Sequence, residues 1–434
     1  MKLLNRINDI SFKRRVAIAV AAFLHIGVTL CIFTIGRFGL FSQQFDRDGI
    51  GHFAKDSIVF RDEAQDLVGM LLHDGLVPWL KAPAELHVKG YSLSLAFFGR
   101  LLGTNILAVE PLNLLYYLAM LALTFKLTKK LASARAAWLA TTIVGVWPSL
   151  LLHSTQLLRD PLFIVALLAL VLILTGLITV TYNWARSMIA GLTAFGAAVL
   201  LWMTRSDMWL VLRTIMVCAI VLLIVRMLRD RRLLLPNLSG IALLLVLTSF
   251  SFQAVQRIEQ TTGVSTGVSA NEVDDLPLWA RIAVRRHHFI SGYADSGSMI
   301  DTDVAFSGPA DIVKYIPRAL AIGYLAPFPE MWFKSGRNVG LSGRLITGIE
   351  TSITYLIEVL ASILIWRKRR DLSIWFLVMT TALGAIATGL VVVNMGTLYR
   401  MRFGFWVLLA ILGSAGLCEL LSFSCEPKII AGRD

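Results

Sequence analysis

The chain has 434 residues, of which 56% are hydrophobic and only 16% are charged, whereas soluble domains carry about 25% charged residues. This composition excludes a soluble globular domain, a disordered chain and a secreted disulfide scaffold. The formal net charge is +13; because the chain is so apolar, we interpret that excess as a signal of membrane orientation and expect no nucleic-acid partner.

Long apolar runs recur along the chain and predict an all-α polytopic membrane protein, because a helix of about 20 apolar residues crosses the hydrocarbon core. We predict about ten transmembrane helices. They cover roughly residues 16–36, 106–126, 136–152, 161–181, 187–203, 208–225, 233–252, 345–366, 372–393 and 403–422. A further apolar stretch, 91–103, is short and contains Gly99, Arg100 and Gly103, which favours a helix at the membrane interface.

The positive-inside rule assigns the two sides of the membrane. If 91–103 does not span and the N-terminus is cytoplasmic, the cytoplasmic segments hold 20 of the 41 Lys and Arg residues and only six of the 28 Asp and Glu residues. If 91–103 did span, the clusters Lys126–Arg135 and Arg226–Arg232 would face outward. We therefore predict a multi-pass protein with both termini in the cytoplasm.

This topology divides the chain into three parts. Residues 1–252 hold the first seven spans and a polar outer segment, 37–105. Residues 253–343 form a second, outer-face loop region, and residues 344–434 hold the last three spans. The four cysteines, Cys31, Cys218, Cys418 and Cys425, show neither a disulfide framework nor metal-ligand spacing, so no metal site is predicted.

The first outer segment contains a predicted surface helix over Arg61–Gly75. Its apolar residues follow helical spacing: Ala64, Leu67, Val68, Leu71 and Leu72. We expect Asp62 to cap the start of this helix and Gly75 to end it. An amphipathic helix of this kind lies along the membrane surface, with Asp62, Asp66 and His73 on its polar edge.

These features resemble the GT-C glycosyltransferases, in particular the dolichyl-phosphate-mannose and aminoarabinose-transferase-like branch. In that family an acidic pair, here Asp62-Glu63, opens the first of two juxtamembrane helices. A histidine-containing stretch opens the second, which closes at a glycine. The matching segments here are His87-Val88-Lys89-Gly90-Tyr91, Leu101-Leu102-Gly103, Trp147-Pro148, Arg159-Asp160 and Tyr399-Arg400-Met401-Arg402. The chain departs from the family at Gln65/Asp66, where Tyr is common, and at Lys89, where Pro is common.

The resemblance implies a GT-C-like fold with two juxtamembrane helices in the first outer loop. It also implies transfer of a sugar, with inversion, from a polyprenyl-phosphate carrier to a lipid-linked glycan or another envelope acceptor. The expected place is the outer face of the inner (plasma) membrane. No cofactor is expected, and a need for a divalent cation is left open.

Glycosyl transfer needs a carboxylate to take the acceptor's proton and cations to meet the phosphate left behind. Asp62 or Glu63 is the expected base, and Asp160 is a second catalytic candidate. The expected substrate-binding residues are His87, Lys89, Arg159, Arg285, Arg286, Arg400 and Arg402.

Each of these residues also has a structural interpretation. Asp62 and Asp160 sit where helix caps are common, and His87 and Lys89 fit a solvated loop. The region with Arg285 and Arg286 would fold as a cap over the outer face, and Arg400 and Arg402 would anchor the last span. Deep in span 8, Glu358 suits either an ion pair with another helix or a proton-coupled role.

Two other functions remain open at this point. An O-antigen polymerase or ligase-like enzyme would use the second outer region, with Arg285 and Arg286. A flippase or transporter for lipid-linked sugars would depend on the charges within the spans, Arg213 and Glu358.

Overall fold

The computed structural model describes residues 2–54, 56–262, 276–292, 298–333 and 340–424. Within these ranges the regular secondary structure is helical, and the only extended pairing is two isolated β-bridges. Eight helices are long and apolar enough to cross a membrane, or nine if one bent pair forms a single span. The prediction of an all-α polytopic membrane protein is confirmed at this level.

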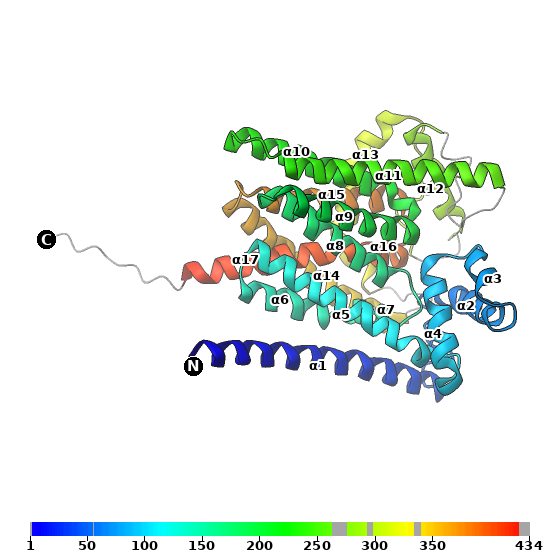
Figure 1. Ribbon diagram of the computed structural model, residues 1–434. Coiled ribbons are helices and arrows are strands. Elements are labelled where there is room, and N and C mark those ends of the chain that lie inside the picture. The colour runs from blue at the N-terminus through cyan, green and yellow to red at the C-terminus, as the bar shows by residue number, and fades with distance from the viewer. Residues whose placement is uncertain (1, 55, 263–275, 293–297, 334–339, 425–434) are drawn as a thin grey trace.

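The long helices run side by side as a bundle, and the short helices α2 to α4 lie together at one end of it (Figure 1). The long helices are α1 (Lys2–Arg37), α5 (Ile106–Leu131), α8 (Asp160–Thr179), α9 (Trp184–Thr204), α10 (Trp209–Asp230), α11 (Leu235–Thr262), α14 (Gly340–Arg367), α15 (Leu372–Val391) and α17 (Phe403–Ser424). The shorter ones are α2 (Asp56–His73), α3 (Leu76–Lys81), α4 (Leu86–Leu102), α6 (Ala134–Gly145), α7 (Pro148–Ser154), α12 (Leu278–Gly292), α13 (Pro309–Leu325) and α16 (Met395–Met401), with 3-10 turns at Ser206–Met208 and Pro329–Met331.

Two predicted spans differ from the structure in detail. The span expected over 136–152 is two helices, α6 and α7, bent by 64°. The break precedes Pro148, which has no amide hydrogen for a continuous helix and disfavours helical geometry at Trp147. The span expected over 233–252 is the apolar part of α11, and this part, Leu235–Ser251, is shorter than the eight candidates. The total of ten spans therefore stays a prediction.

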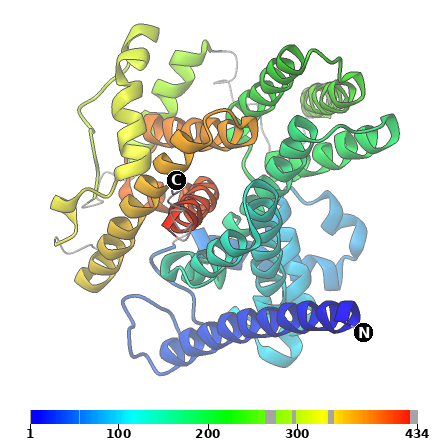
Figure 2. The ribbon, with the colours of Figure 1, turned by 90° about the vertical axis from the view of Figure 1, so that its left-hand side faces the viewer.

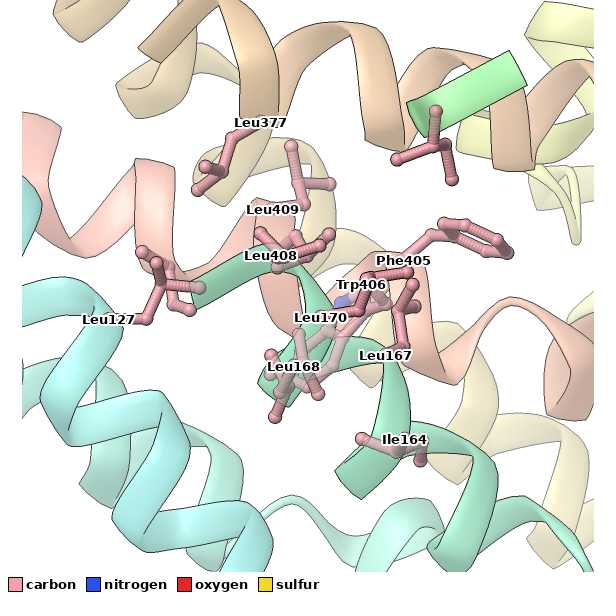
Figure 3. Close-up of a cluster of buried hydrophobic side chains, with 14 of the residues drawn as sticks. Leu127, Ile164, Leu167, Leu168, Leu170, Leu377, Phe405, Trp406, Leu408 and Leu409 are labelled. Carbon is pink, nitrogen blue, oxygen red and sulfur yellow. The ribbon is translucent and has the colours of Figure 1, made fainter. Parts of the chain in front are cut away.

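The core of the bundle forms where α8 and α17 meet. These are the two most buried candidate spans, and α17 lies at the centre when the bundle is viewed along its length (Figure 2). Figure 3 shows leucines of α8, such as Leu167, packed among Leu127 of α5, Leu377 of α15 and Leu408 of α17. All-round apolar helices such as α8 have no polar face to offer water, so they occupy the interior.

Helix α1 lies at the edge of the bundle (Figures 1 and 2) and is held there by buried hydrogen bonds. His25 Nδ1 lies 2.8 Å from Glu110 of α5, and Thr29 donates to the same carboxylate at 2.7 Å. The second His25 nitrogen pairs with Ser154 of α7 at 3.1 Å. Polar groups inside a membrane bundle face one another, so this network fixes the position of α1.

Helix α13 belongs to the region expected as an outer loop, yet it packs along the C-terminal half of α15. A side chain at Gly389 would meet the carbonyl oxygen of Ala319 at 2.0 Å, so glycine allows the two backbones to touch. Towards the end of α13, Tyr324 donates to Thr381, near the middle of α15. The described parts of the region 253–343 thus include helices, and one of these, α13, packs against the bundle.

Candidate functional site

Two carboxylates and two arginines from distant parts of the chain converge at the end of the bundle that carries α2 to α4. Arg400 of α16 donates to Asp56, in the first turn of α2, and its Nε lies 3.3 Å from Asp160 Oδ2. Arg205, which follows α9, donates to the other oxygen of Asp160. We call Asp56, Asp160, Arg205 and Arg400 the carboxylate–arginine cluster. Its charges are paired, which is what allows them to be buried.

Local sequence explains why Asp160 lies at this position. Asp160 is the first residue of α8 and is followed by Pro161, whose fixed backbone angle suits a helix start. A negative charge is favoured at this end of a helix. Asp160 and Arg205 are both almost fully buried, whereas the Asp56 side chain is 34% exposed. Asp56 is therefore the member of the cluster that a substrate can reach.

A second set of polar groups extends the cluster towards solvent. Glu85 stands just before α4, and its carboxylate lies 3.5 Å from Arg159 Nη1 and 3.3 Å from His87 Nδ1. Burial raises the pKa of Glu85, and the charges of Asp207 and Asp56 add to this rise against the opposing effect of Arg159. The rim of the site thus holds a carboxyl group that binds its proton more tightly than an exposed glutamate does.

His87 is buried within this rim. Burial lowers the pKa of its imidazole to about 3, and the positive charges of Arg159 and Arg205 act in the same direction. The ring packs edge-on against Phe60, and within the described residues neither ring nitrogen has a hydrogen-bond partner. His87 therefore does not belong to a solvated loop, and at neutral pH it adds no positive charge to the buried side of the rim.

Asp62 and Glu63, the acidic pair expected to open the first juxtamembrane helix, lie on different sides of α2. Helix α2 begins at Asp56, six residues before Asp62, so Asp62 does not cap it. Glu63 lies about 20° from Asp56 around the helix axis, whereas Asp62 lies about 120° away. Burial raises the pKa of Glu63, and the nearby charge of Glu85 adds to the effect. Glu63 therefore lies near the rim of the site.

Asp62 lies on another side of α2. Its side chain is 61% exposed and accepts a hydrogen bond from Arg61 Nε at 2.9 Å. Arg61 also donates to Asp46 at 2.9 Å. Asp62 is thus part of a surface ion-pair group with the loop before α2. The sequence pattern does not single out Asp56. The signal that could have found it is its position two helical turns before Glu63, which places both carboxylates on the same face of a helix.

A scan against protein-family models finds no match for this chain, and a search of curated proteins finds no significant relative. The geometry of the site therefore carries the functional argument. In the described part of the chain, no group of three or more His, Cys, Asp or Glu side chains is placed to hold a metal ion.

Three other candidate ligands from the sequence lie outside the cluster. Lys89 donates to the carbonyl oxygen of Leu80 at 2.9 Å and so joins α4 to the end of α3. Arg285 donates to the carbonyl oxygen of Asp207 at 2.8 Å, which places it near the edge of the site. Arg286 is buried, and its three nitrogens donate to carbonyl oxygens of Asp301, Val304 and Leu390. Its position supports a structural role.

Arg402 is separated from Arg400 and lies in a second polar group. It is buried and donates to the carbonyl oxygens of Tyr324 and Ala326, at the C-terminal end of α13. A cation at this end of a helix is favourable. Nearby, Tyr399 and Ser149 donate to Glu350 of α14. These contacts connect α7, α13, α14 and α16, so Arg402 supports the packing of the bundle.

Glu358 does not form the ion pair expected as its structural role. Within the described residues its Oε1 has no hydrogen-bond partner, and no cation lies within ion-pair distance. Instead it lines a groove beside α14, together with Leu325, Tyr355 and Trp366. Arg213, the second residue on which a transport function would depend, is exposed on α10.

Proposed function

We propose that this chain is an integral-membrane glycosyltransferase, which moves a sugar from a polyprenyl-phosphate carrier to a lipid-linked glycan or another envelope acceptor. One observation carries the proposal: an accessible carboxylate, Asp56, is held by Arg400 beside a buried Asp160–Arg205 pair, at the end of the bundle covered by α2 to α4. A carboxylate beside clustered arginines matches the two needs of transfer from a sugar phosphate.

Within this proposal, Asp56 replaces Asp62 as the base. Asp56 is partly exposed and belongs to the cluster, whereas Asp62 is paired with Arg61 on the surface of α2. Asp160 is too buried to meet an acceptor and has both oxygens beside arginines. We therefore assign Asp160 a positioning role: with the buried Arg205 as its other partner, it holds Arg400 where the phosphate would arrive.

The cationic side of the site fits a phosphate leaving group. Arg400 and Arg205 reach the cluster from within the bundle, and Arg159 stands at the solvent edge. Arginine presents a planar set of donors that suits phosphate oxygens. Glu85, whose side chain is 34% exposed, adds a hydrogen-bonding group on the same rim, and sugar hydroxyls are the partners that such a group suits. His87 is buried beside it and is uncharged at neutral pH.

The proposed step balances as a single displacement. The acceptor hydroxyl transfers its proton to the Asp56 carboxylate while its oxygen forms a bond to the anomeric carbon. The bond from that carbon to the phosphate oxygen breaks, and the polyprenyl phosphate leaves with the electron pair. The new charge on the phosphate is met by Arg400 and Arg159, which are preorganised by their carboxylate partners.

The test is a transfer assay with purified protein, radiolabelled polyprenyl-phosphate sugars and lipid-linked acceptors. We expect Asp56→Asn to lower the rate by about a hundredfold or more, because general-base catalysis contributes about that much. The matched control, Asp62→Asn, removes the same charge from the same helix and should leave the rate within about twofold. Transfer that survives in Asp56→Asn but not in Asp62→Asn contradicts the assignment.

The same assay separates the two rival functions. A polymerase or ligase-like enzyme predicts loss on Arg285→Ala with Asp56→Asn still active. A flippase or transporter predicts no transfer at all and a loss of lipid translocation on Glu358→Gln. Neither rival explains the carboxylate–arginine cluster, which lies away from Glu358.

A further inference from the structure

A basic pocket lies at the other end of the bundle, away from α2 to α4. Its volume is about 810 Å³. It is lined by Lys130, Arg226, Arg229 and the run Arg367–Arg370, together with Asp371 and the ends of α8 and α15. Figure 2 views the bundle from this end. We call this the basic pocket.

The pocket is assembled from parts of the chain that are far apart. Lys130 comes from the end of α5, Arg226 and Arg229 from the end of α10, and Arg367–Arg370 from the turn between α14 and α15. Arg229 donates to the carbonyl oxygen of Arg370 at 2.9 Å, so the turn is fixed against α10. Loop charges that served only to orient the protein would not need to face one cavity.

The carboxylates near the pocket do not neutralise it. Asp371 accepts from the backbone and hydroxyl of Ser373 and so caps α15. Asp230 lies 3.4 Å from Arg226 and 3.3 Å from Arg229, and Glu419 pairs with Lys368. The seven basic side chains around the pocket therefore keep an excess of positive charge. Among the described residues, no side-chain hydrogen bond or ion pair involves Lys130 or Arg370.

A groove with mostly apolar walls adjoins the basic pocket, and Glu358 and Arg367 are the charged side chains that line it. Arg367 lines both, and the groove continues along α14 past Ile363 and Val359 to Leu325, with a volume of about 630 Å³. At the junction, Trp366 is 73% exposed, and the guanidinium of Arg369 lies 5.5 Å from its ring centre. Exposed tryptophan beside arginine is typical of the membrane–water interface. The groove thus runs from headgroup level into the apolar layer.

We propose that the basic pocket and this groove together bind one anionic phospholipid of the surrounding leaflet, with its phosphate in the pocket and an acyl chain along α14. Basic pockets between membrane helices on the cytoplasmic side bind such headgroups, and the charge distribution predicts that this end faces the cytoplasm. The groove favours a lipid over free phosphate, because an acyl chain can bury apolar surface in it whereas inorganic phosphate has no apolar part. This site is separate from the proposed catalytic cluster.

The experiment is native mass spectrometry of the full chain in detergent, titrated separately with dioleoyl phosphatidylglycerol, dioleoyl phosphatidylcholine and inorganic phosphate. We expect one tightly bound phosphatidylglycerol and weaker binding of the other two. Lys130→Gln/Arg370→Gln should weaken phosphatidylglycerol binding about thirtyfold, since each surface cation contributes roughly a factor of five to anionic lipid binding. The control Arg135→Gln/Arg186→Gln removes two exposed charges at the same end without touching the pocket, and should bind normally.

A second variant tests the groove. Ile363→Trp should fill it and weaken phosphatidylglycerol binding severalfold while sparing inorganic phosphate, whereas Ile349→Trp, on an exposed part of α14, should change neither. Equal binding of the two phospholipids overturns the proposal. So does inorganic phosphate that binds as tightly as the lipid, or an equal loss in the two double variants. If the charge variant fails to fold, the comparison of ligands on the unmodified chain still decides.

Discussion

Arg400 donates a hydrogen bond to Asp56, although the two residues are 344 positions apart in the chain. The same guanidinium lies beside Asp160. One side chain therefore joins the surface layer of α2 to the first turn of a central helix. The proposed site depends on this contact, because it is what brings an accessible carboxylate to the buried pair.

The first prediction concerns the coupling of Arg400 and Asp56. Arg400→Gln should lower the free energy of unfolding by about 3–5 kcal/mol, since it leaves Asp56 without its cation and Asp160 with Arg205 alone. The double variant Asp56→Asn/Arg400→Gln should lose less than the sum of the single variants. Denaturant-induced unfolding in detergent measures all three.

A matched control for this cycle is Arg100→Gln, which removes an exposed arginine from α4 and should cost less than about 1 kcal/mol. Strict additivity of the two cluster variants would show that Arg400 and Asp56 do not interact in the folded protein.

A second prediction follows from the environment of His87. Its pKa falls from 6.5 to about 3 on folding, so between these values the unfolded chain binds a proton that the folded protein does not. The contribution of neutral His87 to the free energy of unfolding should be fully present above pH 6.5. Below that pH the free energy of unfolding should fall by up to about 1.4 kcal/mol per pH unit. Melting curves from pH 7 to 5 measure this slope.

His87→Gln should flatten the slope, because the side chain no longer titrates. Ser94→Ala on the same helix removes a buried hydrogen bond to Ala108 and should lower stability equally at every pH. An unchanged slope in His87→Gln would mean that another group causes the pH dependence.

A third prediction tests the close packing of α13 on α15. Gly389→Ala places a methyl group against the Ala319 carbonyl and should destabilise the protein by about 1–3 kcal/mol, as overpacking does. Gly196→Ala is the control, because a side chain there meets nothing within 4 Å. Thermal melting should show a lower transition for the first variant only. If both variants melt alike, the two helices are not in backbone contact.

A fourth prediction concerns the side of the membrane on which α4 ends. If α4 lies at the interface, cysteines introduced at Arg47 and Thr104, on either side of the α2–α4 layer, should react with the same membrane-impermeant reagent from outside the cell. A cysteine at Arg135, at the other end of the bundle, should be protected. Opposite labelling of the first two positions would place α4 across the bilayer and remove the basis for the proposed outer site.

The class of the protein, and the gathering of its basic loops, could be predicted from sequence. Hydropathy and charge are properties of a single span or loop, so they predict spans and their orientation without knowledge of which helices are neighbours. The charge pattern therefore predicts that Arg226, Arg229 and Arg367–Arg370 share one side, and in the structure they line one pocket. Hydropathy predicts one span over 136–152, whereas the bend of 64° before Pro148 follows from the local backbone chemistry of proline.

Only the tertiary structure determines which residues form the site. Arg400 and Arg402 look equivalent in sequence, but residues two positions apart on a helical turn point in different directions, so one meets Asp56 and the other the end of α13. Asp62 has the better local capping pattern, yet α2 starts at Asp56. Contacts between distant segments, which no local pattern encodes, determine which charges are buried and which partners neutralise them.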